Sequence, residues 1–285
     1  MADTTKEQCY TLITAKHNWF DLNLKEVWQY RDLIVLFTKR NFQVRYKQTI
    51  LGPAWLFINP IISSLIYCFI FGRIAGIGTG EVPQLLFYMS GNAIWAFFSS
   101  SVNRNASTFT ANAALFGKVY FPRLTMPISN VLTSVLEFGI QMILVLLFLI
   151  YYVIMGVVHP NLLAWLLVPV ILLHLGVMGM ACGIIISSLT TKYRDLSILV
   201  TFAIQLWMYI TPVVYPLSQA GKGWIRMILL INPVTAPAEA FRYAVLGQGE
   251  ILAMPLVWSW TFTIVVVLAG IMIFNKVERT FMDTV

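Results

Sequence analysis

The chain has 285 residues, of which 59% are hydrophobic and only 11% are charged, and its mean hydropathy is +0.77. An ordinary soluble domain carries roughly 25% charged residues, so this composition excludes a soluble globular domain and indicates an integral membrane protein. Three cysteines at unrelated positions, Cys9, Cys68 and Cys182, provide neither a disulfide framework nor a metal-ligand spacing.

The first predicted element is a helix that lies on the membrane surface over about residues 27–50. Its apolar run at 33–37 is too short to cross a bilayer and is bracketed by charged residues. Gly52 and Pro53 then turn the chain upright, because proline suits the first turn of a helix, and Pro60 should kink the span that follows. This surface helix either anchors the chain or also transmits force from a cytoplasmic partner.

Six apolar stretches follow, each long enough to cross a membrane as a helix. The run from 124 to 191 carries one formal charge, Glu137, and is too long for one crossing, so it must fold back. We place the break at His159-Pro160-Asn161, since proline ends helices and asparagine favours turns. The stretches that contain the six predicted spans are 48–72 and 82–103, which carry no charged side chain, and 128–158, 162–188, 196–215 and 256–275.

The basic residues are distributed unequally between the two sides of the membrane. Six crossings put both termini on one side, and that side carries 15 of the 19 lysines and arginines. We therefore expect both termini in the cytoplasm, with a cytoplasmic region at 1–52, a transmembrane domain at 53–275 and a cytoplasmic tail at 276–285. The net charge of +7 then reflects topology and not nucleic-acid binding.

Two connections are too long for simple turns. The segment 103–127 predicts a short helix followed by an ordered cytoplasmic hook that contains the aromatic and basic residues 118–123; it could also be an interfacial helix without a partner. The segment 216–255 alternates apolar pieces with prolines. We expect short helices there that dip into the membrane and return.

Four ordered motifs carry a family resemblance: RYKQTILGPAWLFINP, GKVYFPRLTMP, TTKYRDLSILVTFAIQLWMYITPVVYP and LLINPVTAPAEAFRYAVLG. Over about residues 30–250 the chain resembles the permease subunit of polysaccharide ABC exporters. It is most similar to permeases for the O-antigen of lipopolysaccharide, with capsule and teichoic-acid permeases as near relatives.

The resemblance implies an all-α, six-span permease of the bacterial cytoplasmic membrane that works as a homodimer with two copies of a separate ATPase. The cargo would be a lipid-linked polysaccharide, typically carried on undecaprenyl pyrophosphate. The chain would then be no enzyme and would hold no cofactor, with ATP and magnesium bound by the partner. In agreement, the sequence contains no G-x-x-x-x-G-K-[ST] loop.

The resemblance also implies roles for particular residues. In such permeases the surface helix and the hook contact the ATPase, which here corresponds to Arg45, Tyr46, Lys47, Lys118, Tyr120, Phe121 and Arg123. The first and fifth spans line the conduit, where aromatic faces suit sugars, and the candidates are Tyr67, Phe71, Trp207, Tyr209 and Tyr215. These aromatic residues could equally pack against neighbouring helices or lipid. Candidates at the outer mouth are Arg73, Glu81, Trp224 and Arg242.

Glu137 is the one formal charge well inside a predicted span. An ionised side chain at a helix centre costs about 2.5–3.5 kcal/mol on insertion scales, so Glu137 should face protein or water. We favour a structural hydrogen bond over a proton relay, since His174 is its only obvious titratable companion.

Three other functions compete with glycan export. A membrane-embedded glycosyltransferase or lipid-modifying enzyme would need a cluster of carboxylates or a metal site, whereas the twelve acidic residues are dispersed. An ion-coupled carrier should show several ionisable groups at mid-membrane. Export of a drug or a lipid on the same scaffold stays open.

Overall fold

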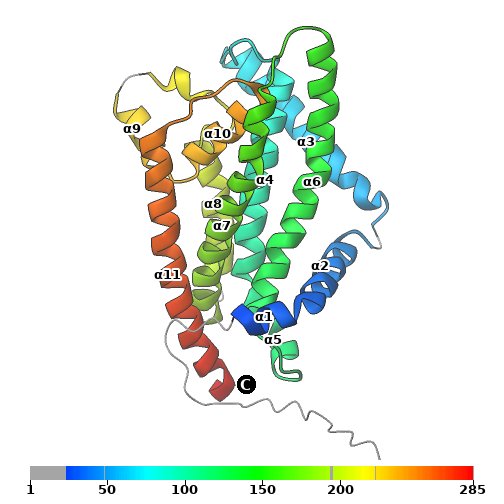
Figure 1. Ribbon diagram of the computed structural model, residues 1–285, viewed down its shortest axis with the longest axis vertical. Coiled ribbons are helices and arrows are strands. Elements are labelled where there is room, and N and C mark those ends of the chain that lie inside the picture. The colour runs from blue at the N-terminus through cyan, green and yellow to red at the C-terminus, as the bar shows by residue number, and fades with distance from the viewer. Residues whose placement is uncertain (1–23, 48, 193–194, 222, 285) are drawn as a thin grey trace, which may run out of the picture.

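The computed structural model describes residues 24–47, 49–192, 195–221 and 223–284. Within these residues all regular structure is helical, which confirms the predicted all-α class. Long helices stand side by side, and α1, α2 and α5 gather at the end where the C-terminus also lies (Figure 1). Residues 1–23 of the predicted cytoplasmic region, and residues 193–194 of the fourth connection, lie outside the described residues.

The predicted surface helix is present as two short pieces, α1 (Leu24–Gln29) and α2 (Arg31–Tyr46). It ends four residues earlier than expected, at Tyr46. The next turn, η1 (Gly52–Ala54), begins at Gly52 with φ +51° and carries Pro53 in its first turn, as the sequence predicts. The chain therefore changes direction where the Gly-Pro pair was expected to turn it.

Within the residues that the structure describes, four helical segments are long and apolar enough to cross a membrane. One of these segments begins with η3 (Leu162–Leu166), and Asn161 caps its start. The side-chain oxygen of Asn161 accepts a hydrogen bond from the backbone N–H of Leu163 at 3.1 Å. The predicted break at 159–161 is thus confirmed. The four segments are Gly52–Ile74, which joins η1, α3 (Trp55–Tyr67) and η2 (Cys68–Ile74); α6 (Thr125–Ile154); Leu162–Thr190, which joins η3 to α7 (Leu167–Lys192); and Ala253–Asn275 of α11 (Ala253–Thr284).

Two further helices occupy the other predicted spans but differ in character. Helix α4 (Gln84–Ala106) is 23 residues long and mostly buried, and it carries many polar residues, which lower its hydropathy. It packs closely on α7, because a side chain at Gly183 would come within 2.4 Å of Asn105 Cβ. Helix α8 (Leu196–Ile210) has only 15 residues.

The two long connections hold the short helices that the sequence predicts. Helix α5 (Thr108–Phe116) is followed by the hook, residues 117–124. An aromatic cluster fixes this end of the molecule by joining Phe37 of α2, Phe109 and Phe116 of α5, Phe121 of the hook and Phe274 of α11. The fifth connection contains α9 (Trp224–Ile231) and the almost wholly buried α10 (Thr235–Leu246).

Candidate functional site

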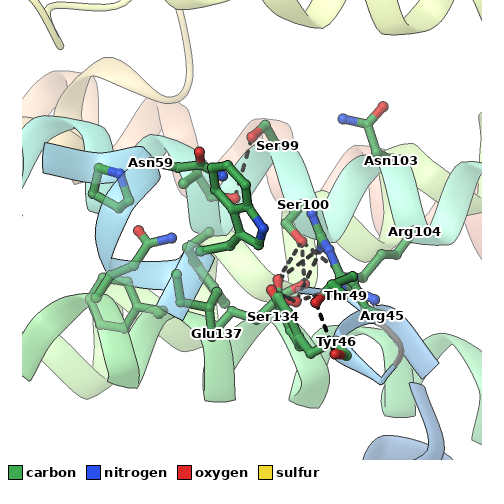
Figure 2. A pocket seen from close by; sticks show the side chains of 17 residues that line it. Arg45, Tyr46, Thr49, Asn59, Ser99, Ser100, Asn103, Arg104, Ser134 and Glu137 are labelled. Atoms are coloured by element: carbon green, nitrogen blue, oxygen red, sulfur yellow. Dashed lines mark hydrogen bonds and ion pairs between the residues drawn. The ribbon is translucent and has the colours of Figure 1, made fainter. Parts of the chain in front are cut away.

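A cavity of about 500 Å³ lies where the end of α2 meets the bundle (Figure 2). Its walls come from the end of α2, the start of α3, the second half of α4 and the middle of α6. These four elements include the surface helix expected to face a cytoplasmic partner. The cavity is therefore the place where the surface helix meets the transmembrane core.

Glu137 of α6 is the centre of a polar cluster on the wall of this cavity. Its Oε1 accepts hydrogen bonds from Arg104 Nη2 at 2.5 Å, Arg45 Nη1 at 3.1 Å and the Tyr46 hydroxyl at 3.1 Å. Its Oε2 accepts from Arg45 Nη1 at 3.3 Å and from the Ser100 hydroxyl at 3.4 Å. Figure 2 shows these side chains converging on the carboxylate.

The cluster confirms that Glu137 faces protein and is held by structural hydrogen bonds. The proton-relay alternative finds no support, because His174 hydrogen-bonds to Thr263 at 2.9 Å and to Ser259 at 3.3 Å and stacks on Trp260 at 4.0 Å. These partners belong to α11 and not to the Glu137 cluster. Two arginines compensate one carboxylate, whose side chain is 8% exposed, so the desolvation cost is offset by charge and hydrogen bonding together.

Tyr46 contributes a neutral donor to the cluster. Burial, together with the nearby negative charge of Glu137, raises the pKa of Tyr46 to about 12. The phenol therefore keeps its proton throughout the physiological range and donates it to the carboxylate.

Helix α2 is attached to α6 at two more points. Asn41 donates to Asn130 Oδ1 at 3.2 Å, and the Thr38 hydroxyl reaches the backbone carbonyl of Ser129 at 3.4 Å. Together with Arg45 and Glu137, these contacts join successive turns of the two helices. The surface helix is therefore held against α6 at three points.

The residues expected to contact an ATPase divide into exposed and buried groups. Lys47 and Lys118 are exposed, and Tyr120 is 66% exposed, with its hydroxyl 3.4 Å from Glu26 Oε1. By contrast, Phe121 belongs to the aromatic cluster, and Arg123 is 7% exposed and lies over the ring of Phe116 at 5.8 Å. Contact with an ATPase stays a prediction for all seven residues, and Arg45 and Tyr46 already bind Glu137.

The aromatic residues expected along a conduit connect α3, α4 and α8. Tyr67 of α3 donates to Met208 Sδ at 3.7 Å. Trp207 of α8 donates to Asn232 Oδ1 at 3.0 Å and packs edge-on against Trp95 and Phe98. Trp95 and Trp207 therefore pack against each other between α4 and α8.

Of the other conduit candidates, Tyr209 is exposed and Phe71 and Tyr215 are partly buried. Tyr209 is 53% exposed, the Tyr215 hydroxyl donates to the Tyr209 carbonyl at 3.0 Å, and Phe71 is partly buried beside Tyr67. Both roles considered for these aromatic residues, packing and lining, are compatible with this arrangement. The lining role stays a prediction.

The four outer-mouth candidates occupy different environments. Arg73, Glu81 and Trp224 are exposed, Trp224 to 74%. Arg242 is 3% exposed, where it forms an ion pair with Glu239 of the same helix and donates to the carbonyl of Pro212 at 2.6 Å. Its guanidinium also lies 4.1 Å from the ring centre of Phe87. The mouth assignment stays a prediction, and the observed contacts of Arg242 hold α10 against the end of α8.

The sequence did not predict two of the residues that form these ion pairs, Arg104 and Glu239. Arg104 was placed in a connection but belongs to the last turn of α4, where it reaches Glu137. Glu239 stands three residues before Arg242, and opposite charges at that spacing on a helix are a signal that could have identified the pair. In the part of the chain that the structure describes, no group of three or more His, Cys, Asp or Glu side chains could hold a metal ion.

Comparison with known proteins gives one consistent result. Residues 32–246 match the ABC-2 type transporter family. Two proteins of Klebsiella pneumoniae, each an O-antigen export system permease protein RfbA, are 31% and 30% identical over 258 and 255 residues, which cover 88% of this chain and 94% of each relative. The O-antigen export system permease protein RfbA of Myxococcus xanthus is 27% identical over 266 residues, which cover 92% of this chain and 98% of that protein.

Proposed function

Because the chain belongs to the ABC-2 type transporter family, we propose that it is the membrane subunit of an ATP-driven exporter. Its cargo is a lipid-linked polysaccharide of the O-antigen type, moved across the bacterial cytoplasmic membrane. The observation that carries this proposal is the similarity to O-antigen export permeases over nearly the whole length of both chains.

The proposal includes six crossings. Four crossings are the apolar spans, and α4 and α8 provide the other two. The 23 residues of α4 extend about 35 Å at 1.5 Å per residue, and α8 is shorter. Polar residues on α4 are tolerated because neighbouring helices cover them. With six crossings and the basic residues on one side, both termini are cytoplasmic, and α9 and α10 form a re-entrant pair at the outer mouth.

The energy comes from a separate ATPase, two copies of which bind a homodimer of this chain. The exposed Lys118 and Tyr120 of the hook, with the outer face of α2, offer a docking surface. Movement of α2 reaches the core through Arg45 and Glu137, since these residues link α2 to α6 directly. The surface helix is thus a lever, and the turn at Gly52 is its pivot.

The conduit lies along α3 and α8, where Tyr67, Trp207 and Tyr215 present amphipathic rings. Such rings bind sugar faces weakly and repeatedly, as a passing glycan requires. A related ABC permease for capsule, teichoic acid, a lipid or a drug is the second candidate, since the scaffold alone does not define cargo.

A cell-based export assay tests the proposal. The gene is deleted from its host, and surface polysaccharide and lipid-linked polysaccharide in the cytoplasmic leaflet are both measured. We expect surface polysaccharide to disappear while the lipid-linked form accumulates, and both to recover with the wild-type gene. Unchanged surface polysaccharide in the deletion strain would refute the assignment.

The docking surface is tested in the same strain with Lys118→Glu and, as a matched charge reversal on the opposite side of the membrane, Arg73→Glu. We expect Lys118→Glu to reduce co-purification of the ATPase and Arg73→Glu to retain it. Equal recovery with both variants would remove the hook from the docking surface.

A further inference from the structure

The cavity beside Glu137 carries more positive than negative charge. Arg45 and Arg104 share the single carboxylate of Glu137, and that carboxylate is the one acidic group among the described lining residues. The lining therefore has a net charge of about plus one, which favours an anionic occupant.

Both arginines retain donors for such an occupant. Arg45 makes both of its bonds to Glu137 through Nη1, and Arg104 uses Nε for Ser100 and Nη2 for Glu137. Among the described residues no acceptor is bonded to Nη2 of Arg45 or to Nη1 of Arg104. The guanidinium fork matches the oxygens of a phosphate, which two arginines can hold from two directions.

Neutral polar groups complete the lining. Thr49, Asn59, Ser99 and Asn103 offer hydroxyls and amides (Figure 2). Gln141 also lines the cavity, and its buried Oε1 accepts no hydrogen bond. A ligand that carries a hydroxyl as well as a phosphate would satisfy this acceptor.

The cavity is lined in part by the start of the first candidate membrane span. Trp55, at its rim, is 40% exposed and stands at the start of the first span, where indole rings favour the headgroup level. Only 17% of the apolar stretch of that span is buried by this chain, so surface of α3 outside the proposed conduit is available to acyl or prenyl chains. A volume of about 500 Å³ lies within the usual range of ligand pockets.

We propose that this cavity binds the phosphate of a lipid headgroup from the cytoplasmic leaflet. Arg45 and Arg104 hold the phosphate oxygens, and the lipid chain runs along the exposed face of α3. The phosphate belongs either to an anionic bilayer phospholipid or to a polyprenyl diphosphate, and the two share this chemistry. The inference goes beyond the export function, because it assigns a ligand to a site within one subunit.

Isothermal titration calorimetry on the detergent-purified chain tests the proposal with three probes: dihexanoyl phosphatidylglycerol, a polyprenyl diphosphate and inorganic pyrophosphate. We expect at least one lipid probe to bind, and Arg45→Gln and Arg104→Gln each to weaken it by about tenfold. Arg40→Gln is the matched control, because Arg40 is an exposed arginine of the same helix that bonds to Asn41 outside the cavity. It should leave the affinity unchanged.

Glu137→Gln should change lipid affinity in the direction opposite to the arginine variants. Removing the carboxylate frees the donors of both arginines, so lipid affinity should rise by about tenfold, whereas a merely structural cluster would lose affinity. This variant also keeps the proposal falsifiable if Arg104→Gln does not fold. Preferred binding of phosphatidylglycerol identifies a bilayer lipid as the ligand, and preferred binding of the diphosphate identifies the cargo class.

Three results would overturn the proposal. They are an equal loss of affinity in Arg40→Gln, weaker lipid binding in Glu137→Gln, and pyrophosphate binding as tight as that of either lipid. The assay contains neither ATPase nor glycan, so its failure would leave the proposed export function standing.

Discussion

Two arginine–glutamate clusters show how similar chemistry serves different ends in this molecule. At the Arg242 cluster, both charged side chains lie on α10, three residues apart, and are 3% and 4% exposed. At the Glu137 cluster, the charges come from α2, α4 and α6, and Arg45 is 55% exposed. The first cluster is local and sealed, which suits a fixed joint. The second joins separate helices beside a cavity, which suits a contact that moves or binds.

The free energy of unfolding should depend more on the Arg242–Glu239 pair than on the Glu137 cluster. Arg242→Gln leaves Glu239 buried without its charge partner and removes the donor to Pro212, so we expect a loss of about 3–5 kcal/mol in the free energy of unfolding. Thermal unfolding of the detergent-purified protein, followed by tryptophan fluorescence, measures the loss. Arg73→Gln, at an exposed arginine, is the control, and equal stability of the two variants would show that the sealed pair has no structural role.

The open cluster should lose export more than stability. Glu137→Gln removes one charge but leaves Arg45 accessible to water, so we expect a loss of only about 1–2 kcal/mol in the free energy of unfolding. Export per folded transporter should nevertheless fall severalfold, because α2 loses its ionic link to α6. Export in proportion to folded protein would contradict the difference drawn between the clusters. Glu250→Gln is the control, because it removes the partly exposed ion pair with Arg226 and Glu250 has no proposed role in export.

A substitution at Trp207 should affect both stability and export. Trp207→Phe keeps an aromatic ring against Trp95 and Phe98 but removes the hydrogen bond to Asn232, at a cost of about 1 kcal/mol. If Trp207 also touches the glycan, export should fall more than this stability loss explains. Trp258→Phe is the control, because Trp258 is no conduit candidate and its replacement also removes one hydrogen bond, that to the Ile231 carbonyl at 2.7 Å. Wild-type export by Trp207→Phe would remove Trp207 from the proposed conduit.

The smallest expected effect concerns pH at Tyr46. Its folded pKa, about 12, lies above the ordinary value of 10, so the neutral form stabilises the fold. That contribution is fully present below pH 10 and is lost as the pH rises towards 12. The stability difference between wild type and Tyr46→Phe should be constant below pH 10 and shrink above it. A constant difference up to pH 12 would contradict the proposed hydrogen bond to Glu137.

The sequence predicted most of the helices because hydropathy and prolines are local signals. The surface helix, the break at 159–161, the helix and hook at 108–124 and the short helices after Pro216 all follow from such signals. Hydropathy does not identify α4 as a candidate span, because its many polar residues lower the mean hydropathy of the helix. Neighbouring helices cover these polar residues, and hydropathy takes no account of that cover. Among the described residues, length and composition therefore identify four candidate spans, and the six crossings stay a proposal.

The Glu137 cluster could be predicted only in part. The cost of burying a charge required partners, but these are Arg104 and Arg45, which are 33 and 92 residues away in sequence. Nothing in the periodicity of one helix indicates which other helix lies beside it. The Arg242 pair, by contrast, is local, so its helical spacing contained the signal.

The central claim is that α2 drives the transmembrane core through Arg45 and Glu137. A double-mutant cycle in proteoliposomes that contain this chain, the proposed ATPase partner and the proposed lipid-linked polysaccharide cargo tests it most directly, with ATP-dependent export per folded transporter as the readout. We predict that Arg45→Gln and Glu137→Gln each reduce export severalfold and that the double variant is no worse than either. Additive losses, or wild-type export by the double variant, would contradict the claim.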